Sequence, residues 1–313
     1  MSQGAKFFAK IDLQSAYHQI RIDEDSQALT TVITHCGTFK YTRMPFGIKS
    51  APSAFQRIIN AILGNQQGVL CYLDDILVSG TTRSELREKL QSVLTKLREH
   101  NVKINEDKSI KEATRLEWLG HEISAREIQP ATNQVEKISR LKPPTSQKEV
   151  RQILGVINYY CRFIEKLAVT AQSIFASLKK NATIKWTEKE DAALKQIVRT
   201  ICKRPALAPF NTLSNRKVVL TTDASELGMG AVLEQEQDSG EIRPVAYWSS
   251  QFRAYEKNYA VGEKEALAVV SAMTKFRKYL LGRQFVLQTD HKALITTLNQ
   301  SSSKRKVSRI ERW

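Results

Sequence analysis

The sequence predicts a multidomain protein of mixed α+β and α/β class. Its 313 residues exceed an ordinary single domain, and 42% of them are hydrophobic, which is enough for more than one core. Short apolar runs typical of buried strands alternate with amphipathic helical segments. A break at Pro143 and Pro144 opens a mainly helical stretch, and strand-like runs return after residue 217.

The first part opens with an apolar run over residues 7–11, which predicts a short strand with Asp12 at its end. Ser15 is a suitable N-cap for a helix directly after it. Residues 30–41 are rich in β-branched and aromatic side chains around a central glycine, which predicts a hairpin. A turn and a helix with one apolar face follow, and the helix is expected to end at Gly64.

Two adjacent carboxylates, Asp74 and Asp75, stand between the apolar runs 69–73 and 76–78. The runs predict two short buried strands with the aspartates at the turn between them. One interpretation is an ordinary β-turn, in which Asp is common. The other is a metal site for phosphoryl transfer, because two buried anions repel and favour a nearby cation. Such a site holds two Mg²⁺ ions about 3.5–4 Å apart, and Asp12 supplies the further carboxylate it needs.

Three further helices have recognisable starts. Ser84 is expected to cap a helix with a leucine-rich stripe. In the helical stretch, Ser146 and Glu149 have the spacing of a capping box, and Thr187 and Glu190 repeat it.

The last part of the chain predicts strands that end in acids. Asp223 closes one apolar run, and Asp290 closes another. A helix from about Gly262 lies between them and carries Glu265 in its first turns, with Glu263 as a competing acid. Each acid alone is better explained as a cap or a surface charge.

Charge and composition restrict the class of partner. Lys and Arg total 48 against 32 Asp and Glu, a net charge of +16, which indicates a nucleic-acid partner, with generic basicity as the alternative. No apolar run approaches the roughly 18–20 residues of a membrane span. No signal peptide is expected, so we predict an intracellular protein that is not secreted. The scattered Cys36, Cys71, Cys161 and Cys202 predict neither a zinc site nor a disulfide framework.

Four segments resemble the motifs of reverse transcriptases, and they occur in the order found in that family. They are residues 8–20, residues 44–56, the Tyr-Leu-Asp-Asp sequence of residues 72–75, and residues 118–124. The amino-acid sequences of these segments are most similar to those of the polyproteins of gypsy-type LTR retrotransposons. The three acids of the last part resemble the site of ribonuclease H.

The resemblance implies a right-hand polymerase palm with partial fingers over residues 1–125. A helical thumb and tether over residues 126–212 and a ribonuclease H-like α/β domain over residues 213–313 would follow. The family has fingers before Asp12 that are largely missing here, and it continues past residue 313 to a fourth nuclease acid. We therefore expect a chain truncated at both ends.

The resemblance also implies two acidic sites, each with two Mg²⁺ ions. The expected metal-binding and catalytic acids are Asp12, Asp74 and Asp75 for the polymerase, and Asp223, Glu265 and Asp290 for the nuclease. Because the fourth nuclease acid lies beyond this chain, we expect weak ribonuclease H activity at ordinary Mg²⁺, with Mn²⁺ as a partial substitute.

Further residues are assigned to the nucleotide. The Leu13 carbonyl would be an additional metal ligand, and Tyr17 would lie beneath the sugar and exclude a 2′-hydroxyl. Phe46 would line the nucleotide pocket, and Lys108 would approach the triphosphate. The alternatives are core packing for Tyr17 and Phe46 and an exposed surface lysine for Lys108.

A primer grip is implied at Trp118, Leu119 and Gly120, with a buried aromatic on a strand as the alternative.

The implied function is RNA-directed DNA synthesis with hydrolysis of RNA–DNA hybrids. Its partners would be an RNA template, a DNA primer, the hybrid and deoxynucleotide triphosphates, in an oligomeric state left open. The rival hypothesis is a nucleic-acid-binding remnant without catalysis, which the truncated ends favour and the six acids oppose.

Overall fold

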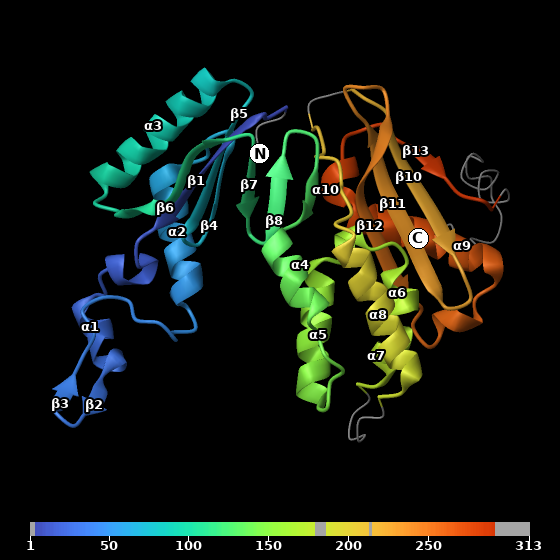
Figure 1. Cartoon of the computed structure of the whole chain (residues 1–313), viewed down its shortest axis with the longest axis horizontal. Helices are drawn as coiled ribbons and strands as arrows, with labels where there is room; N and C mark the ends of the chain where they lie inside the picture. The colour runs from blue at the N-terminus through green and yellow to red at the C-terminus, as the bar shows by residue number, and fades with distance from the viewer. Residues whose placement is uncertain (1–3, 179–185, 213–214, 292–313) are drawn as a thin grey trace, which may run out of the picture. The chain divides into compact units, whose positions relative to one another are not determined.

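The computed structural model describes residues 4–178, 186–212 and 215–291 (Figure 1). The chain divides into two compact units, Met1–Ala125 and Arg126–Trp313. The mixed α/β class expected from the sequence is confirmed, with several sheets and covering helices. The domain boundaries expected from the resemblance stay a prediction.

The first unit is built on a four-stranded antiparallel sheet with strand order β4-β5-β1-β6. The strands are β1 (Phe7–Leu13), β4 (Val69–Tyr72), β5 (Asp75–Gly80) and β6 (Ile104–Ala113). Side chains alternate between the faces, so Ala9, Ile11 and Leu13 enter one core while Phe8 enters another on the opposite face. The strands predicted on either side of the Asp pair are confirmed.

Two helices cover one face of this sheet: α2 (Ala51–Leu63) and α3 (Arg83–Glu99) (Figure 1). Helix α2 ends at Gly64, which has a φ of 67° as predicted for a C-terminal glycine. The predicted cap at Ser84 is wrong, because Thr82 caps α3 by accepting the N–H of Glu85. Thr82 and Glu85 have the Ser/Thr-x-x-Glu spacing, and Thr82 has the extended backbone of an N-cap.

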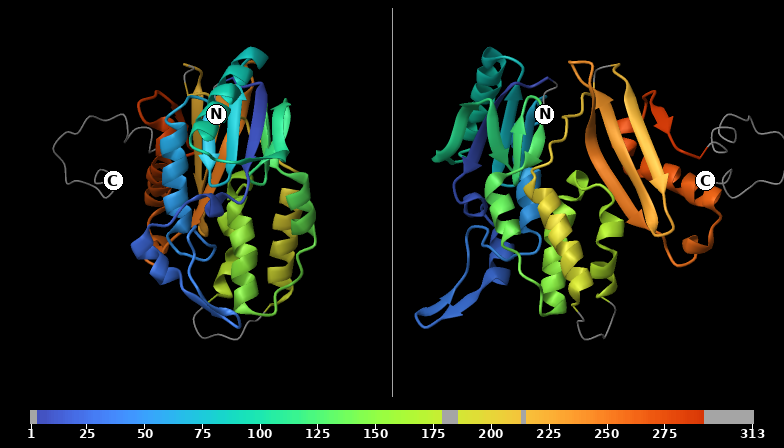
Figure 2. Two further views of the ribbon diagram at one scale, coloured as in Figure 1. Left: turned by 90° about the vertical axis from the view of Figure 1, so that its left-hand side faces the viewer. Right: turned by 45° about the vertical axis from the view of Figure 1, so that its right-hand side comes forward.

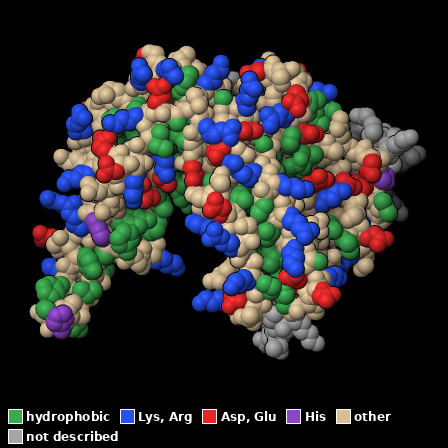
Figure 3. Space-filling view, in the orientation of Figure 1, with side chains coloured by type: hydrophobic (Ala, Val, Ile, Leu, Met, Phe, Trp, Pro, Cys, Tyr) green, Lys and Arg blue, Asp and Glu red, His purple; other side chains and the backbone are tan. Residues whose placement is uncertain are grey.

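Short elements complete the first unit. The predicted hairpin is present as β2 (Val32–Thr34) and β3 (Gly37–Phe39), and Figure 3 shows hydrophobic side chains along it. The helix predicted after Ser15 is only the 3₁₀ turn η1 (Ala16–Gln19), because Ser15 is left-handed and makes no capping hydrogen bond in the described chain. The remaining elements are α1 (Glu24–Gln27), η2 (Ala28–Thr30) and the paired strands β7 (Arg115–Trp118) and β8 (His121–Ser124).

The second unit begins with a helical part around its own core. It contains β9 (Ile128–Pro130), α4 (Thr132–Ser139), α5 (Gln147–Tyr159), η3 (Cys161–Phe163), α6 (Leu167–Thr170), α7 (Gln172–Ala176) and α8 (Glu188–Cys202). Ser146 and Thr187 cap α5 and α8 as predicted, and Glu190 completes the capping box of α8. Val150 and Ile197 are fully buried in the core between these helices.

The second unit also contains a four-stranded sheet with strand order β12-β11-β10-β13. The strands are β10 (Val218–Ala224), β11 (Gly228–Glu236), β12 (Ile242–Gln251) and β13 (Val286–Gln288). The helical elements are η4 (Glu256–Asn258), α9 (Val261–Lys275) and α10 (Arg277–Leu280). Helix α9 lies along one face of the sheet, where Ala272 packs with Leu220 and Leu233 (Figure 2).

Strand β13 is parallel to β10, whereas β10 pairs with β11, and β11 with β12, in antiparallel fashion. The carboxyl ends of β10 and β13 therefore meet at the same edge of the sheet. Residues 292–313, which follow these strands, lie outside the described residues. None of the helices in the described ranges is long and apolar enough to span a bilayer, and all four cysteines are free thiols.

Candidate active sites

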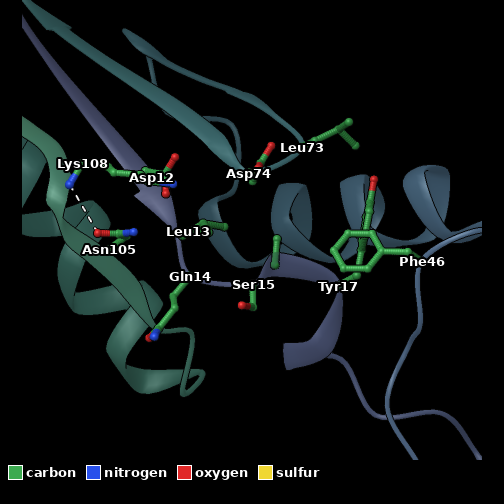
Figure 4. A pocket seen from close by; sticks show the side chains of 11 residues that line it. Asp12, Leu13, Gln14, Ser15, Tyr17, Phe46, Leu73, Asp74, Asn105 and Lys108 are labelled. Carbon is green, nitrogen blue, oxygen red and sulfur yellow. Dashed lines mark hydrogen bonds between the residues drawn. The ribbon is translucent and has the colours of Figure 1, made fainter. Parts of the chain in front are cut away.

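A cavity of about 450 Å³ opens in the first unit at the end of β1 (Figure 4). It is lined by residues from β1, the segment after it, the loop before α2, the β4–β5 turn and β6. Six of the residues predicted for the polymerase site line it: Asp12, Leu13, Tyr17, Phe46, Asp74 and Lys108. These residues are separated by up to 96 positions in the sequence, so the sheet brings them together.

A local irregularity between β1 and β6 directs Asp12 into this cavity. The register between the two strands shifts on both sides of Lys10. The Asp12 N–H donates to Ser109 Oγ at 3.1 Å, and the Ser109 hydroxyl donates to the Asn105 carbonyl at 2.6 Å. Bulges of this kind re-aim side chains and are frequent beside active sites.

The β4–β5 turn presents Asp74. Leu73 has a φ of 52°, and the Leu13 N–H donates to the Asp74 carbonyl at 3.0 Å, which ties the turn to β1. The side chain of Gln56 accepts the Leu73 N–H at 2.7 Å and donates to the Cys71 carbonyl at 3.1 Å. Sequence reasoning missed Gln56; its available signal was an amide beside Phe55 on an otherwise apolar helix face.

Asp75 has different surroundings from its neighbour. It lies directly opposite Asp12 across the β1–β5 ladder, and it does not line the cavity. Its Oδ1 forms an ion pair with Lys10 Nζ at 2.9 Å. Lys10 also had no predicted role, although its position two residues before Asp12 places both side chains on one face of the strand.

Burial raises the pKa of the Asp12 carboxyl above its usual value. The charges of Asp75 and Asp74 raise this pKa further, while those of Lys108 and Lys10 lower it. A partly buried anion that is disfavoured by its neighbours favours an added cation, so these oxygen ligands fit a divalent metal ion.

Tyr17 contacts both the cavity and the core. Its ring makes edge-to-face contacts with Phe46 and Phe55, with 5.5 Å between centroids in each pair. Phe55 is 1% exposed, whereas Phe46 is 67% exposed. Tyr17 is therefore anchored on the core while its ring lines the cavity, and the two interpretations of this residue are compatible.

The predicted primer grip does not line the cavity. Trp118 packs against a cluster that contains Phe8, Leu77 and Leu116. Leu119 and Gly120 form the β7–β8 turn, with φ values of 46° and 67°. This geometry agrees with the packing alternative for Trp118, and a role in holding a primer stays a prediction.

A second group of acids lies in the second unit. Asp223, Glu265 and Asp290 each present a carboxylate oxygen, and these oxygens all lie within 4.8 Å of one another. Asp223 lies near the end of β10, Asp290 follows the end of the adjacent β13 by two residues, and Glu265 comes from α9. Glu263 lies outside this cluster of described acids; its Oε2 accepts the Ala260 N–H at 3.1 Å, as at a helix start.

The cluster fits a hard divalent cation. Glu265 is 4% exposed, and its Oε1 accepts the Ala224 N–H at 3.2 Å. Its Oε2 is buried without a hydrogen-bond partner among the described residues, which is costly unless a ligand satisfies it. Burial raises the pKa of Glu265, and the charge of Asp290 adds to the rise. Lys166 Nζ pairs with Asp223 Oδ2 at 3.1 Å, and this hydrogen bond raises the pKa of Lys166.

Two family models match the chain. Residues 1–123 match the reverse transcriptase (RNA-dependent DNA polymerase) family, and residues 214–313 match the RNase H-like domain found in reverse transcriptase. The Tf2-3 and Tf2-4 transposon polyproteins of Schizosaccharomyces pombe are each 35% identical over 99% of this chain. The chain spans 23% of the length of these polyproteins.

The fold is similar to solved structures of the foamy viral protease-reverse transcriptase. A structure in complex with dsDNA has a TM-score of 0.81 at 23% identity, over 96% of this chain and 63% of that one. A structure in complex with an RNA/DNA hybrid has a TM-score of 0.77 at 24% identity, over 93% of this chain and 40% of that one. The chain therefore contains a region of the reverse transcriptase family, residues 1–123, followed by an RNase H-like domain of the kind found in reverse transcriptase, residues 214–313.

Proposed function

We propose that this chain is an RNA-directed DNA polymerase whose site is the cavity of the first unit. The observation that carries the proposal is the convergence of Asp12 and Asp74, from two different parts of the sequence, on one cavity with Lys108. Carboxylates beside a lysine match the needs of triphosphate chemistry, in which metal ions bridge phosphate oxygens and cations offset their charge.

Each residue has a proposed task in that reaction. Asp12 and Asp74 hold Mg²⁺, with the Leu13 carbonyl as a further ligand and Asp75 as the adjacent carboxylate. Lys108 neutralises triphosphate oxygens, and Tyr17 and Phe46 form the surface for the sugar and base. Bound Mg²⁺ supplies charge stabilisation at the phosphoryl oxygens and an activated water at the nuclease site. The protein contributes mainly positioning and preorganised charge.

A second activity is proposed for the acids of the second unit. Asp223, Glu265 and Asp290 would hold Mg²⁺ for hydrolysis of the RNA strand of an RNA–DNA hybrid. The support is the compact group of carboxylates with a buried, unpartnered oxygen on Glu265. Both matching families are families of enzymes. A noncatalytic remnant is not favoured, because both sets of acids remain grouped in space.

The partners we propose are a primer–template duplex, an RNA–DNA hybrid and deoxynucleotide triphosphates. The net charge of +16 suits a polyanionic partner, and Figure 3 shows Lys and Arg side chains spread over the face in view. The foamy viral proteins of similar fold were solved with dsDNA and with an RNA/DNA hybrid.

The test is primer extension on an RNA template with Mg²⁺, using the full chain and Asp74→Asn. The substitution keeps the size of the side chain but removes a metal-binding charge, so extension should be lost while duplex affinity is retained. Asp107→Asn is the matched control, because Asp107 is an exposed acid on β6 that does not line the cavity. Equal extension by wild type and Asp74→Asn would contradict the proposed site.

A further inference from the structure

Lys10 and Asp75 form a partly buried ion pair on the sheet of the first unit. Their Nζ and Oδ1 atoms are 2.9 Å apart, and each side chain is 22% exposed. Asp75 is the direct cross-strand partner of Asp12, and Lys10 precedes Asp12 by two residues on the same strand. All three side chains therefore project from the same face, opposite the one that α2 and α3 cover.

The ion pair between Lys10 and Asp75 offsets the electrostatic repulsion between the carboxylates of the site. Like charges directly opposite each other on neighbouring strands are destabilising. Asp12 and Asp75 are such a pair, and Asp74 adds a third acid at the adjacent turn. A diagonal neighbour on the paired strand is within reach of a long side chain, which is the position that Lys10 has relative to Asp75.

The ion pair also distinguishes two adjacent aspartates. Asp74 lines the cavity, whereas Asp75 lies beside Lys10 and does not line it. A lysine bound to a carboxylate competes with a metal ion for the same oxygens, and its charge opposes the approach of another cation. Lys10 is therefore expected to stabilise the metal-free protein and to oppose the binding of a metal ion.

We propose that Lys10 is a positioning residue that holds Asp75 on the sheet and acts as the internal counter-charge of the carboxylate site. This inference rests on the proposed polymerase site. Lys10 stabilises the first unit without metal, leaves Asp12 and Asp74 directed at the cavity, and lowers the affinity of the site for a divalent cation.

The test compares Lys10→Met with its parent, both in the full chain with Asp223→Asn so that the second acidic cluster is weakened. Calorimetric titration with Mn²⁺ should give a Kd about two- to fivefold lower for Lys10→Met, the size of effect expected for one ion pair. In EDTA, the melting temperature of Lys10→Met should be lower than that of its parent. At saturating Mn²⁺, the difference in melting temperature between the two proteins should be smaller.

Three further variants separate this role from a merely structural one. Lys10→Arg keeps the charge and should resemble the parent. Lys111→Met removes a lysine of the neighbouring strand β6, which pairs with Glu106 of the same strand at 3.0 Å, and both of these side chains are exposed. This variant should change neither the Kd for Mn²⁺ nor the melting temperature. Asp12→Asn should weaken Mn²⁺ binding.

The outcomes are distinguishable. If Asp12→Asn weakens Mn²⁺ binding but Lys10→Met leaves the Kd unchanged, this inference is wrong and the proposed metal site survives. An equal loss of melting temperature in EDTA and in Mn²⁺ would also overturn it. If Asp12→Asn binds Mn²⁺ as tightly as the parent, the metal site itself is wrong, and the inference is overturned with it.

Discussion

The side-chain carbonyl of Gln56, on helix α2, accepts a hydrogen bond from the backbone N–H of Leu73 at 2.7 Å. Leu73 immediately precedes Asp74 and has a φ of 52°, which is uncommon for a residue other than glycine. The same amide donates to the Cys71 carbonyl, so one side chain holds both the end of β4 and the first residue of the turn. The position of the Asp74 carboxylate thus depends on a residue that never needs to touch the substrate.

Gln56→Leu should therefore reduce kcat for primer extension while leaving duplex affinity unchanged. The unpaired Leu73 N–H should also cost the first unit about 1–3 kcal/mol in the free energy of unfolding. Gln56→Glu keeps an acceptor for the Leu73 N–H, so its losses in kcat and in the free energy of unfolding should be smaller than those of Gln56→Leu. The control is Gln66→Leu, since Gln66 makes a side-chain bond to Ser92 away from the cavity. Wild-type kcat in Gln56→Leu would refute this role.

Tyr17→Ala should raise the use of ribonucleotides relative to deoxynucleotides. The ring lines the cavity between Phe46 and Phe55, where it can exclude a 2′-hydroxyl by size. The measurement is the ratio of kcat/KM for the two nucleotide types. Tyr17→Phe keeps the ring and should retain wild-type selectivity. Unchanged selectivity in an active Tyr17→Ala variant would leave Tyr17 as a packing residue alone.

Glu265→Gln and Glu263→Gln should have different effects although they are two residues apart. Glu265→Gln should abolish cleavage of an RNA–DNA hybrid without lowering stability in EDTA, because burial already disfavours the charged form of Glu265. Glu263→Gln should retain cleavage, and its free energy of unfolding should fall by about 0.3–1 kcal/mol, as expected for the loss of an acid at a helix N-terminus. Loss of cleavage in Glu263→Gln with retention in Glu265→Gln would reverse the assignment.

Glu85 should make the stability of the first unit depend on pH in the acid range. Its hydrogen bonds from Lys89 and Thr81 lower its pKa from 4.5 to about 2. An acid with a lowered pKa in the folded state stabilises the protein above its unfolded pKa, and this contribution disappears as pH falls towards the folded pKa. The advantage of wild type over Glu85→Gln should therefore be full above pH 4.5 and decrease between pH 4.5 and 2.

Urea unfolding across this pH range measures that difference. Glu88→Gln, on the same helix, is the matched control variant. A difference between wild type and Glu85→Gln that stays constant with pH would contradict the assignment. Because α3 packs on the sheet that carries Asp12, weaker capping of α3 should also reduce the stability of the polymerase site.

The sequence by itself determined the elements that carry the acids. Short apolar runs predicted the strands around Asp12 and Asp74, and capping spacing predicted the starts of α5 and α8. These features are local: a run of apolar residues, a turn, or a side chain that bonds to a backbone N–H three residues away. The resemblance to reverse transcriptases depended on the same local segments and named the family that the comparisons support.

Only the tertiary structure decided how chemically identical neighbours differ. Residues two apart on a helix point about 200° apart, so the packing of α9 on its sheet selects Glu265 for the acidic cluster and leaves Glu263 at the helix start. Likewise, the pairing of β1 with β5 brings Lys10 to Asp75, whereas the turn leaves Asp74 on the cavity. These contacts join residues far apart in the chain, and no local pattern specifies them.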